Sequence, residues 1–255
     1  MLPDICTYTI GDVHGRADLL KAMLTAIDVD AEQNDWTPRI IFLGDIIDHG
    51  PNSRSAMDLV CRTLKNTPDS RLILGNHDNF LLEFMTGETM DAARFGRWLD
   101  RVGGYETFLS YGLEGFRSLD DIAAYFREEY ADHLEVLQNA DRMIVDRKFA
   151  FVHAGIDPDL PLDQQSERDL MWIRDKFLDF DGPLPHLFVH GHTPSPDYVP
   201  VVKSNRIGID TWAFRSNILT SLAVSPSQTE LSFIVVDGST GEELAIRKIP
   251  VPSSG

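Results

Sequence analysis

Apolar and polar positions follow two different periods along the first part of the chain. Three short apolar runs, at residues 5–10, 39–43 and 71–74, are typical of buried strands. Two longer segments between them, at residues 16–29 and about 54–65, place apolar side chains at helical spacing. This alternation of strands and helices predicts a largely parallel sheet that is covered by helices.

The middle of the chain has a different pattern. Residues 80–140 are rich in helix-type segments and aromatic side chains, which predicts a helical insertion. The insertion either caps a site or packs beside the sheet, and the pattern favours neither alternative. Its aromatic residues are Phe84, Phe95, Trp98, Tyr105, Phe108, Tyr111, Phe116, Tyr125, Phe126 and Tyr130.

The last part of the chain returns to strand-type sequence. Residues 143–152 predict two strands around a turn, and residues 166–177 predict a helix. Further strands are predicted at residues 187–190, 198–202, 206–209, 218–224, 231–236 and 243–249, the last two flanking a hairpin signal. We expect a single domain over residues 1–255 with a frayed tail at residues 250–255.

Composition and charge narrow the class of function. The 255 residues include 23 Lys and Arg against 40 Asp and Glu, a formal charge of −17. This acidity disfavours nucleic-acid binding, and an anionic substrate would need a locally positive site, which bound metal ions can supply. The two cysteines, Cys6 and Cys61, and the absence of a signal-peptide or membrane-spanning pattern favour a cytoplasmic protein without a membrane partner. The oligomeric state stays open.

Five short fragments with metal-binding or acid–base side chains interrupt this pattern. Three of them follow predicted strands, so Asp12, Asp45 and Asn76 are expected to meet at the carboxyl ends of neighbouring strands. Aspartate, asparagine and histidine suit hard to borderline divalent metals. The fragments are Gly11-Asp12-Val13-His14-Gly15, Gly44-Asp45-Ile46-Ile47-Asp48, Gly75-Asn76-His77-Asp78, Val152-His153-Ala154-Gly155 and His190-Gly191-His192-Thr193.

Spacing suggests a role for several of these residues. Asp12 and His14 lie two apart, which puts both side chains on one side of an extended strand end. Asp45 has two carboxylate oxygens and can bridge two cations roughly 3.5–4 Å apart. Asp48 can instead fix the tautomer of a catalytic imidazole, and His77 is free to act as a general acid. Each residue alone is as readily structural, and the combination favours a shared metal site.

In this order the fragments resemble the motifs of the metallophosphoesterase superfamily. The longer strings at residues 44–53 and 191–194 are similar to blocks of the bacterial branch of the phosphoprotein phosphatase family, which also contains diadenosine tetraphosphate hydrolases. The resemblance covers residues 8–212. It implies an α/β fold, a four-layer αββα sandwich with the helical insertion, and a site at the carboxyl ends of the strands.

The resemblance also implies two divalent metal ions, with manganese as the first expectation and iron, zinc or magnesium as alternatives. One ion takes Asp12, His14 and Asp45, and the second takes Asp45, Asn76, His153 and His192. The family's His–Asp dyad corresponds to His77 and Asp48. A hydroxide that bridges the two ions would attack phosphorus in line, while His77 protonates the leaving group.

The chain departs from the family where an arginine is expected to clamp phosphate. His49 follows Asp48, and an imidazole lacks the planar fork with which a guanidinium binds phosphate. Arg54 is a candidate substitute, and Arg174 resembles the second phosphate-binding arginine of the bacterial enzymes. Trp212 stands where close relatives have glycine, and it either narrows the entrance or packs on the insertion.

Three functions stay open at this point. The leading hypothesis is a metal-dependent phosphomonoesterase with serine/threonine protein phosphatase-like chemistry. The second is a hydrolase of dinucleoside polyphosphates or of another small phosphorylated metabolite. The third, motivated by His49, is a catalytically weakened module that binds metal or phosphate.

Overall fold

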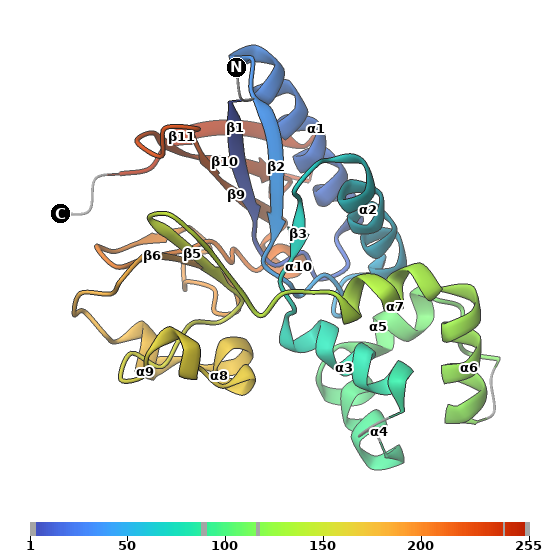
Figure 1. Ribbon diagram of the computed structural model, residues 1–255. Helices are drawn as coiled ribbons and strands as arrows, with labels where there is room; N and C mark the ends of the chain where they lie inside the picture. The colour runs from blue at the N-terminus through green and yellow to red at the C-terminus, as the bar shows by residue number, and fades with distance from the viewer. Residues whose placement is uncertain (1–3, 88–90, 116–117, 242, 253–255) are drawn as a thin grey trace.

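The computed structural model describes residues 4–87, 91–115, 118–241 and 243–252. Within these residues, the strands form two mixed sheets that pack face to face (Figure 1). The first sheet has the order β11 (Ala245–Pro250), β10 (Leu231–Asp237), β9 (Ile218–Val224), β1 (Ile5–Ile10), β2 (Thr37–Phe42) and β3 (Arg71–Leu72). The second has the order β4 (Met143–Asp146), β5 (Phe149–Val152), β6 (Leu187–His190), β8 (Arg206–Gly208) and β7 (Val201–Val202).

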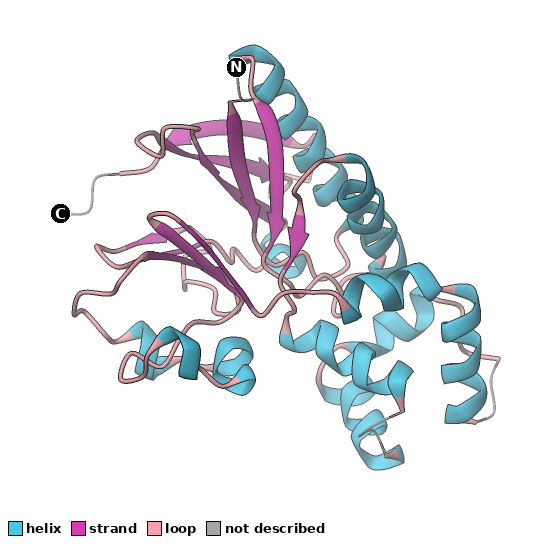
Figure 2. Cartoon of the chain, viewed as in Figure 1, coloured by secondary structure: helices cyan, strands magenta, loops and turns pink. Residues whose placement is uncertain are grey.

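Helices cover the outer face of each sheet (Figure 2). The first sheet is covered by α1 (Ala17–Asn34) and α2 (Ser53–Asn66), and the second by α8 (Glu167–Trp172) and α9 (Asp175–Leu178). The result is the four-layer αββα sandwich that the sequence predicts. A short 3-10 helix, Leu162–Gln164, precedes α8, and α10 (Ala213–Ser216) follows β8.

A group of five helices extends from one end of the first sheet. It consists of α3 (Asn76–Thr86), α4 (Ala92–Arg101), α5 (Gly104–Ser110), α6 (Leu119–Glu129) and α7 (Ala131–Gln138), and we call it the helical segment. Its first helix begins at Asn76, shortly after β3, rather than at residue 80. The predicted insertion residue Phe116 lies outside the described residues.

Alternation of side chains along the strands explains the four layers. In β2, Ile40 and Phe42 belong to the apolar cluster beneath the helices, whereas Ile41 belongs to the cluster between the sheets. In β5, Phe151 faces the first sheet and Val152 packs with residues of α8 and α9. Successive side chains of a strand point to opposite faces, so strands in the middle layers are apolar throughout.

Several predicted boundaries differ from the structure, and three of the differences have local reasons. The first helix continues past residue 29 to Asn34, because Asp30 is buried there and bonded to the Tyr8 hydroxyl and Lys248. The predicted helix at 166–177 is interrupted, since Ile173 adopts an extended conformation between α8 and α9. The predicted frayed tail is wrong at its start, because Pro250 pairs with Ser232. Residues 253–255 lie outside the described residues.

The loops that follow the strands are tight, and Gly44 is the clearest case. Its φ of +94° is left-handed, and an added Cβ would overlap the backbone nitrogen of Gly75. Five neighbouring non-glycine residues also have positive φ, which costs roughly 1–3 kcal/mol each and is typical of functional sites. These residues are His14, Asp45, Asp48, His49 and His192.

A glycine pair tests how far this close approach matters for stability. Gly112 also has a left-handed φ, of +71°, but nothing lies within 4 Å of its added Cβ. Both Gly44→Ala and Gly112→Ala carry the backbone penalty of roughly 1–2 kcal/mol. Only Gly44→Ala adds the overlap, so we expect its melting temperature to fall several degrees further in a thermal unfolding scan. Equal melting temperatures would contradict this reading of the loop.

Candidate active site

The structure brings the predicted metal ligands together at the carboxyl ends of the strands. Ligand atoms of Asp12, His14 and Asp45 lie within 4.8 Å of one another, and so do those of Asp45, His153 and His192. Asp45 belongs to both groups, as the prediction of a bridging carboxylate requires. The parallel neighbours β1, β2 and β3 deliver three of these loops to one edge of the first sheet (Figure 1).

Backbone carbonyls orient two of the imidazoles. The Nδ1–H of His14 donates to the Ile47 carbonyl at 2.9 Å, and the Nδ1–H of His153 donates to the Leu43 carbonyl at 2.8 Å. Each bond leaves the Nε2 lone pair facing Asp45 Oδ2, at 3.7 Å and 3.4 Å respectively. A metal-binding histidine is commonly held this way, with its second nitrogen bonded to a carbonyl.

The Asn76 amide faces two more imidazole nitrogens. Its Oδ1 lies 2.9 Å from His153 Nε2, and the same end of the amide is 2.8 Å from His192 Nδ1. With the opposite orientation the amide NH₂ would donate to both rings. Burial lowers the pKa of His153, but Asp45 outweighs it and raises that pKa, so the protonated ring can donate from Nε2 to Asn76 Oδ1. Once the ring loses this proton, Asn76 Oδ1, His153 Nε2 and His192 Nδ1 each offer a lone pair, an arrangement that a cation stabilises.

Burial keeps two of these imidazoles neutral, as metal ligation requires. Burial, reinforced by the nearby His77, lowers the pKa of His14 to about 3. Burial and the charge of His153 lower the pKa of His192 to about 2. Both rings therefore offer a lone pair at neutral pH.

Buried carboxylates crowd the same space. Burial, together with Asp210 and Asp45, raises the pKa of Asp12 well above its ordinary range, and burial and Asp45 raise that of Asp78 to about 7. Among the described residues, the buried atoms Asp12 Oδ1 and His192 Nε2 have no hydrogen-bond partner. Divalent cations would relieve both the repulsion and the missing bond at Asp12, so the donor set fits two such ions.

Two further aspartates, Asp78 and Asp210, lie at this centre, and the sequence analysis assigns neither of them a role. Asp78 is fully buried and its Oδ1 accepts a hydrogen bond from the Ile46 backbone nitrogen at 2.9 Å, which holds the loop after β2. Asp210 accepts from the Trp212 backbone nitrogen at 2.8 Å, and its pKa is raised to about 7 by burial. Asp78 could have been found from the sequence, because it belongs to one of the five fragments. No motif in the sequence marks Asp210.

A histidine and an aspartate form a hydrogen-bonded pair beside the ligands. The His77 Nδ1–H donates to Asp48 Oδ2 at 2.8 Å. The same oxygen accepts from Trp98 Nε1 at 2.8 Å, and the other oxygen accepts from the Thr107 hydroxyl at 2.7 Å. Asp48 is fully buried, so these three donors hold its carboxylate in one orientation.

Charges around His77 favour its protonated form. Burial works against the imidazolium, but Asp45 and the hydrogen bond to Asp48 outweigh it and raise the pKa of His77 to about 9. Its Nδ1–H is committed to Asp48, so Nε2 is the nitrogen that can present a proton to a substrate. This is the geometry required of a general acid.

The helical segment therefore contributes directly to the site. Trp98 lies on α4 and Thr107 on α5, about 50 and 60 residues after Asp48 in the chain. The Gly103 carbonyl between them accepts from the His49 backbone nitrogen at 2.9 Å. The segment packs against the loop that carries the dyad, a contact that no local pattern predicts.

The candidate phosphate-binding residues occupy three different environments. His49 lies beside His77, with ring centroids 5.1 Å apart, and stacks on Phe214 at 4.3 Å. The Arg54 guanidinium lies over the Tyr130 ring, 5.5 Å from its centroid, so its contacts are with the helical segment. Arg174 is exposed and close enough to His192 to lower its pKa further. The role of each in substrate binding stays a prediction.

Trp212 is half-buried near the same edge. Its ring lies 5.7 Å from Tyr198 and 5.9 Å from Phe214, and Arg215 covers its face at 4.7 Å. These contacts are with its own loop and with the loop after β6. They favour neither predicted role, narrowing the entrance or packing on the helical segment.

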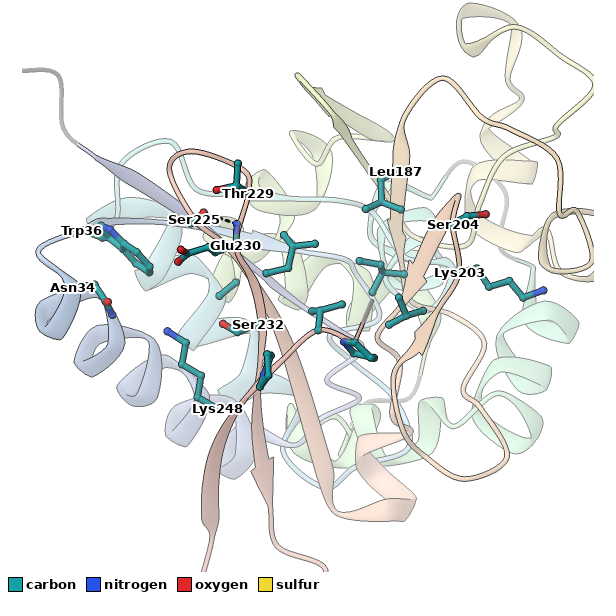
Figure 3. A pocket seen from close by; sticks show the side chains of 17 residues that line it. Asn34, Trp36, Leu187, Lys203, Ser204, Ser225, Thr229, Glu230, Ser232 and Lys248 are labelled. Carbon is teal, nitrogen blue, oxygen red and sulfur yellow. Dashed lines mark hydrogen bonds between the residues drawn. The ribbon is translucent and has the colours of Figure 1, made fainter. Parts of the chain in front are cut away.

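A separate cavity of about 700 Å³ opens between the two sheets (Figure 3). Figure 3 shows Trp36 and Lys248 on one side of it and Leu187 and Ser204 on the other. Trp36 precedes β2 and Leu187 begins β6, so the cavity lies at the amino ends of the parallel strands. The length of the strands separates it from the ligands, and we assign it no part in the site.

The chain matches a known protein family over most of its length. Residues 7–218 match the model of the calcineurin-like phosphoesterases, and the chain belongs to this family. Its members are hydrolases that act on phosphoesters and use divalent metal ions. None of the helices that the structure describes combines the length and apolar character needed to span a bilayer.

Individual relatives cover different parts of the molecule. The symmetrical bis(5'-nucleosyl)-tetraphosphatase of Klebsiella pneumoniae (strain 342) is 32% identical over 64% of this chain, which spans about half (49%) of that relative. The crystal structure of a provisionally named diadenosine tetraphosphatase covers 99% of this chain and 100% of its own, with 18% identity and a TM-score of 0.55. A serine/threonine phosphatase from Saccharomyces cerevisiae aligns over 100% of this chain and 82% of its own, with 12% identity and a TM-score of 0.54. These two structures share the fold.

The hydrogen bond from Thr107 to Asp48 yields a test of the dyad. Thr107→Val removes a donor to a buried carboxylate and should lower kcat roughly ten- to a hundredfold, since such bonds contribute about 1.5–3 kcal/mol. The loss should be larger with an alkyl phosphate than with p-nitrophenyl phosphate, whose leaving group needs little protonation. Thr107→Ser keeps the hydroxyl and is the matched control. Equal losses with both substrates would count against His77 as the acid.

Proposed function

We propose that this chain hydrolyses phosphate esters and anhydrides at a two-metal centre. The observation that carries the proposal is the sharing of Asp45 between two groups of buried ligand atoms beside the His77–Asp48 pair. In this proposal Asp12 and His14 complete one ion's ligands with Asp45. Asn76, His153 and His192 complete those of the other. Manganese is the ion we would try first.

The two ions would lower the pKa of a water molecule and neutralise charge on the phosphoryl oxygens. The chain's own residues supply the remaining requirements. Asp45 belongs to both groups of ligands and so joins them. Its side chain also accepts a hydrogen bond from the His77 backbone N–H at 2.9 Å. His77 presents its Nε2 proton to the leaving oxygen, and Asp48 keeps the ring oriented.

Dinucleoside polyphosphates are the substrate class that we propose. Curated relatives at 30–32% identity are named symmetrical bis(5'-nucleosyl)-tetraphosphatases, although this chain spans only about half (49%) of their length. One aromatic ring also lies next to a proposed ligand of each ion, with Phe214 5.3 Å from His14 and Trp172 6.0 Å from His192. Aromatic rings near both groups of ligands suit a substrate with a base at each end.

We further propose that residues 1–255 form one catalytic domain, with the helical segment as an insertion that supports the dyad. The serine/threonine phosphatase hypothesis rests on the shared motifs and on a common fold. It assigns the same roles to the metal ligands and to His77. Only the substrate distinguishes it from our proposal, so the two are separated by substrate specificity.

A substrate panel tests both the chemistry and the substrate class. Metal-stripped protein titrated with Mn²⁺ should hydrolyse p-nitrophenyl phosphate, and Asn76→Ala should lower kcat by about 10²-fold or more. His77→Asn should lower kcat by a similar factor with an alkyl phosphate and by less with p-nitrophenyl phosphate, whose leaving group needs little protonation. Diadenosine tetraphosphate should be preferred over a phosphoserine peptide in kcat/KM. The reverse preference would support the protein phosphatase hypothesis, and no turnover with any divalent metal would support the binding module.

His49→Arg separates a weakened site from a specialised one. If the missing arginine limits catalysis, the variant should gain at least roughly tenfold in p-nitrophenyl phosphate turnover, about 1.4 kcal/mol of barrier. We expect no such gain, because in the proposed mechanism the two ions, and not residue 49, neutralise the charge on the phosphoryl oxygens. A tenfold gain would show that the site is catalytically impaired.

A further inference from the structure

A cavity of about 690 Å³ opens beside the dyad, between the helical segment and α10. Part of its wall comes from the end of α4 and the start of α5, including Leu99 and Tyr105. The rest comes from His49 and Phe214. The cavity therefore adjoins the proposed site and is formed largely by residues that the mechanism does not use.

Ring contacts connect this cavity to the reacting groups. His49 and Phe214 stack with an interplanar angle of 12°, and His49 lies 5.1 Å from the His77 ring. His77 is the residue that would protonate the departing oxygen. The cavity thus lies on the side where the leaving group would emerge, an argument that rests on the proposed function.

The chemistry of the walls indicates what would bind there. Tyr105 is 53% exposed, so a large aromatic face is accessible, and Leu99 and Phe214 are half-buried. Asp100 and Glu106 also line the cavity and can accept N–H and O–H donors. Two carboxylates would repel a run of phosphates, although Arg101 lies with them. Aromatic faces with nearby acceptors match an amino-bearing nucleobase and its ribose.

We propose that this cavity binds the nucleoside of the leaving nucleotide of a dinucleoside polyphosphate. Tyr105 and Phe214 supply aromatic surfaces for the base, and Asp100 and Glu106 accept its N–H or the ribose O–H groups. His49 forms part of the nucleoside site through its stack on Phe214.

Binding of two ligands that differ only in the nucleoside tests this directly. ADP and inorganic pyrophosphate are titrated calorimetrically into Mn²⁺-loaded protein, as the wild type and as Tyr105→Ala, Phe214→Leu and Tyr125→Ala. Tyr125 lies in the same helical segment but does not line the cavity, so it is the matched aromatic control. Tyr105→Ala and Phe214→Leu should weaken ADP binding on the order of tenfold. Neither should weaken pyrophosphate binding comparably, and Tyr125→Ala should leave ADP binding as in the wild type.

Each contrary outcome has a distinct meaning. If ADP and pyrophosphate weaken together, the cavity residues support the metal site and the nucleoside assignment is overturned. If neither weakens in the two cavity variants while the wild type hydrolyses diadenosine tetraphosphate, the nucleoside binds elsewhere and the proposed function survives. If the wild type hydrolyses p-nitrophenyl phosphate but not diadenosine tetraphosphate, the proposed substrate class fails and the assignment fails with it.

Discussion

The site depends on burying like charges around Asp45. Asp12, Asp45 and Asp78 are each at most 2% exposed and close enough to shift one another's pKa. Burial would raise the pKa of Asp45 as well, but His153 and His77 outweigh it and hold that pKa well below its usual range. Such a cluster is unfavourable unless cations or imidazoles balance it.

The helical segment is tied to this cluster through Asp48. Hydrogen bonds from Trp98 and Thr107 fix the carboxylate that orients His77, and the Gly103 carbonyl holds the His49 backbone. The sequence predicts only that this segment is helical and rich in aromatic residues. In the structure, its hydrogen bonds hold the His77–Asp48 pair in place. The same segment forms one wall of the cavity beside it.

The apolar runs predict the helix-covered sheet because they are local signals, and the family resemblance adds the four layers. Asp12, Asp45 and Asn76 each follow such a run, so parallel pairing brings them together, while their role as metal ligands stays a prediction. The partners of Asp48 were not predictable in this way, because Trp98 and Thr107 approach through tertiary packing and sit in ordinary helical sequence. The importance of Phe214 likewise could not be predicted from the sequence, because it depends on the stack on His49.

Counting bound metal is the most direct test of the central claim. Metal-stripped protein is reconstituted with Mn²⁺, and bound metal per chain is measured by mass spectrometry beside p-nitrophenyl phosphate turnover. The account predicts two ions per chain, with turnover rising as the second site fills, and a lower metal content in His153→Asn. Full turnover without metal, or a single ion per chain at full activity, would contradict the shared centre at Asp45.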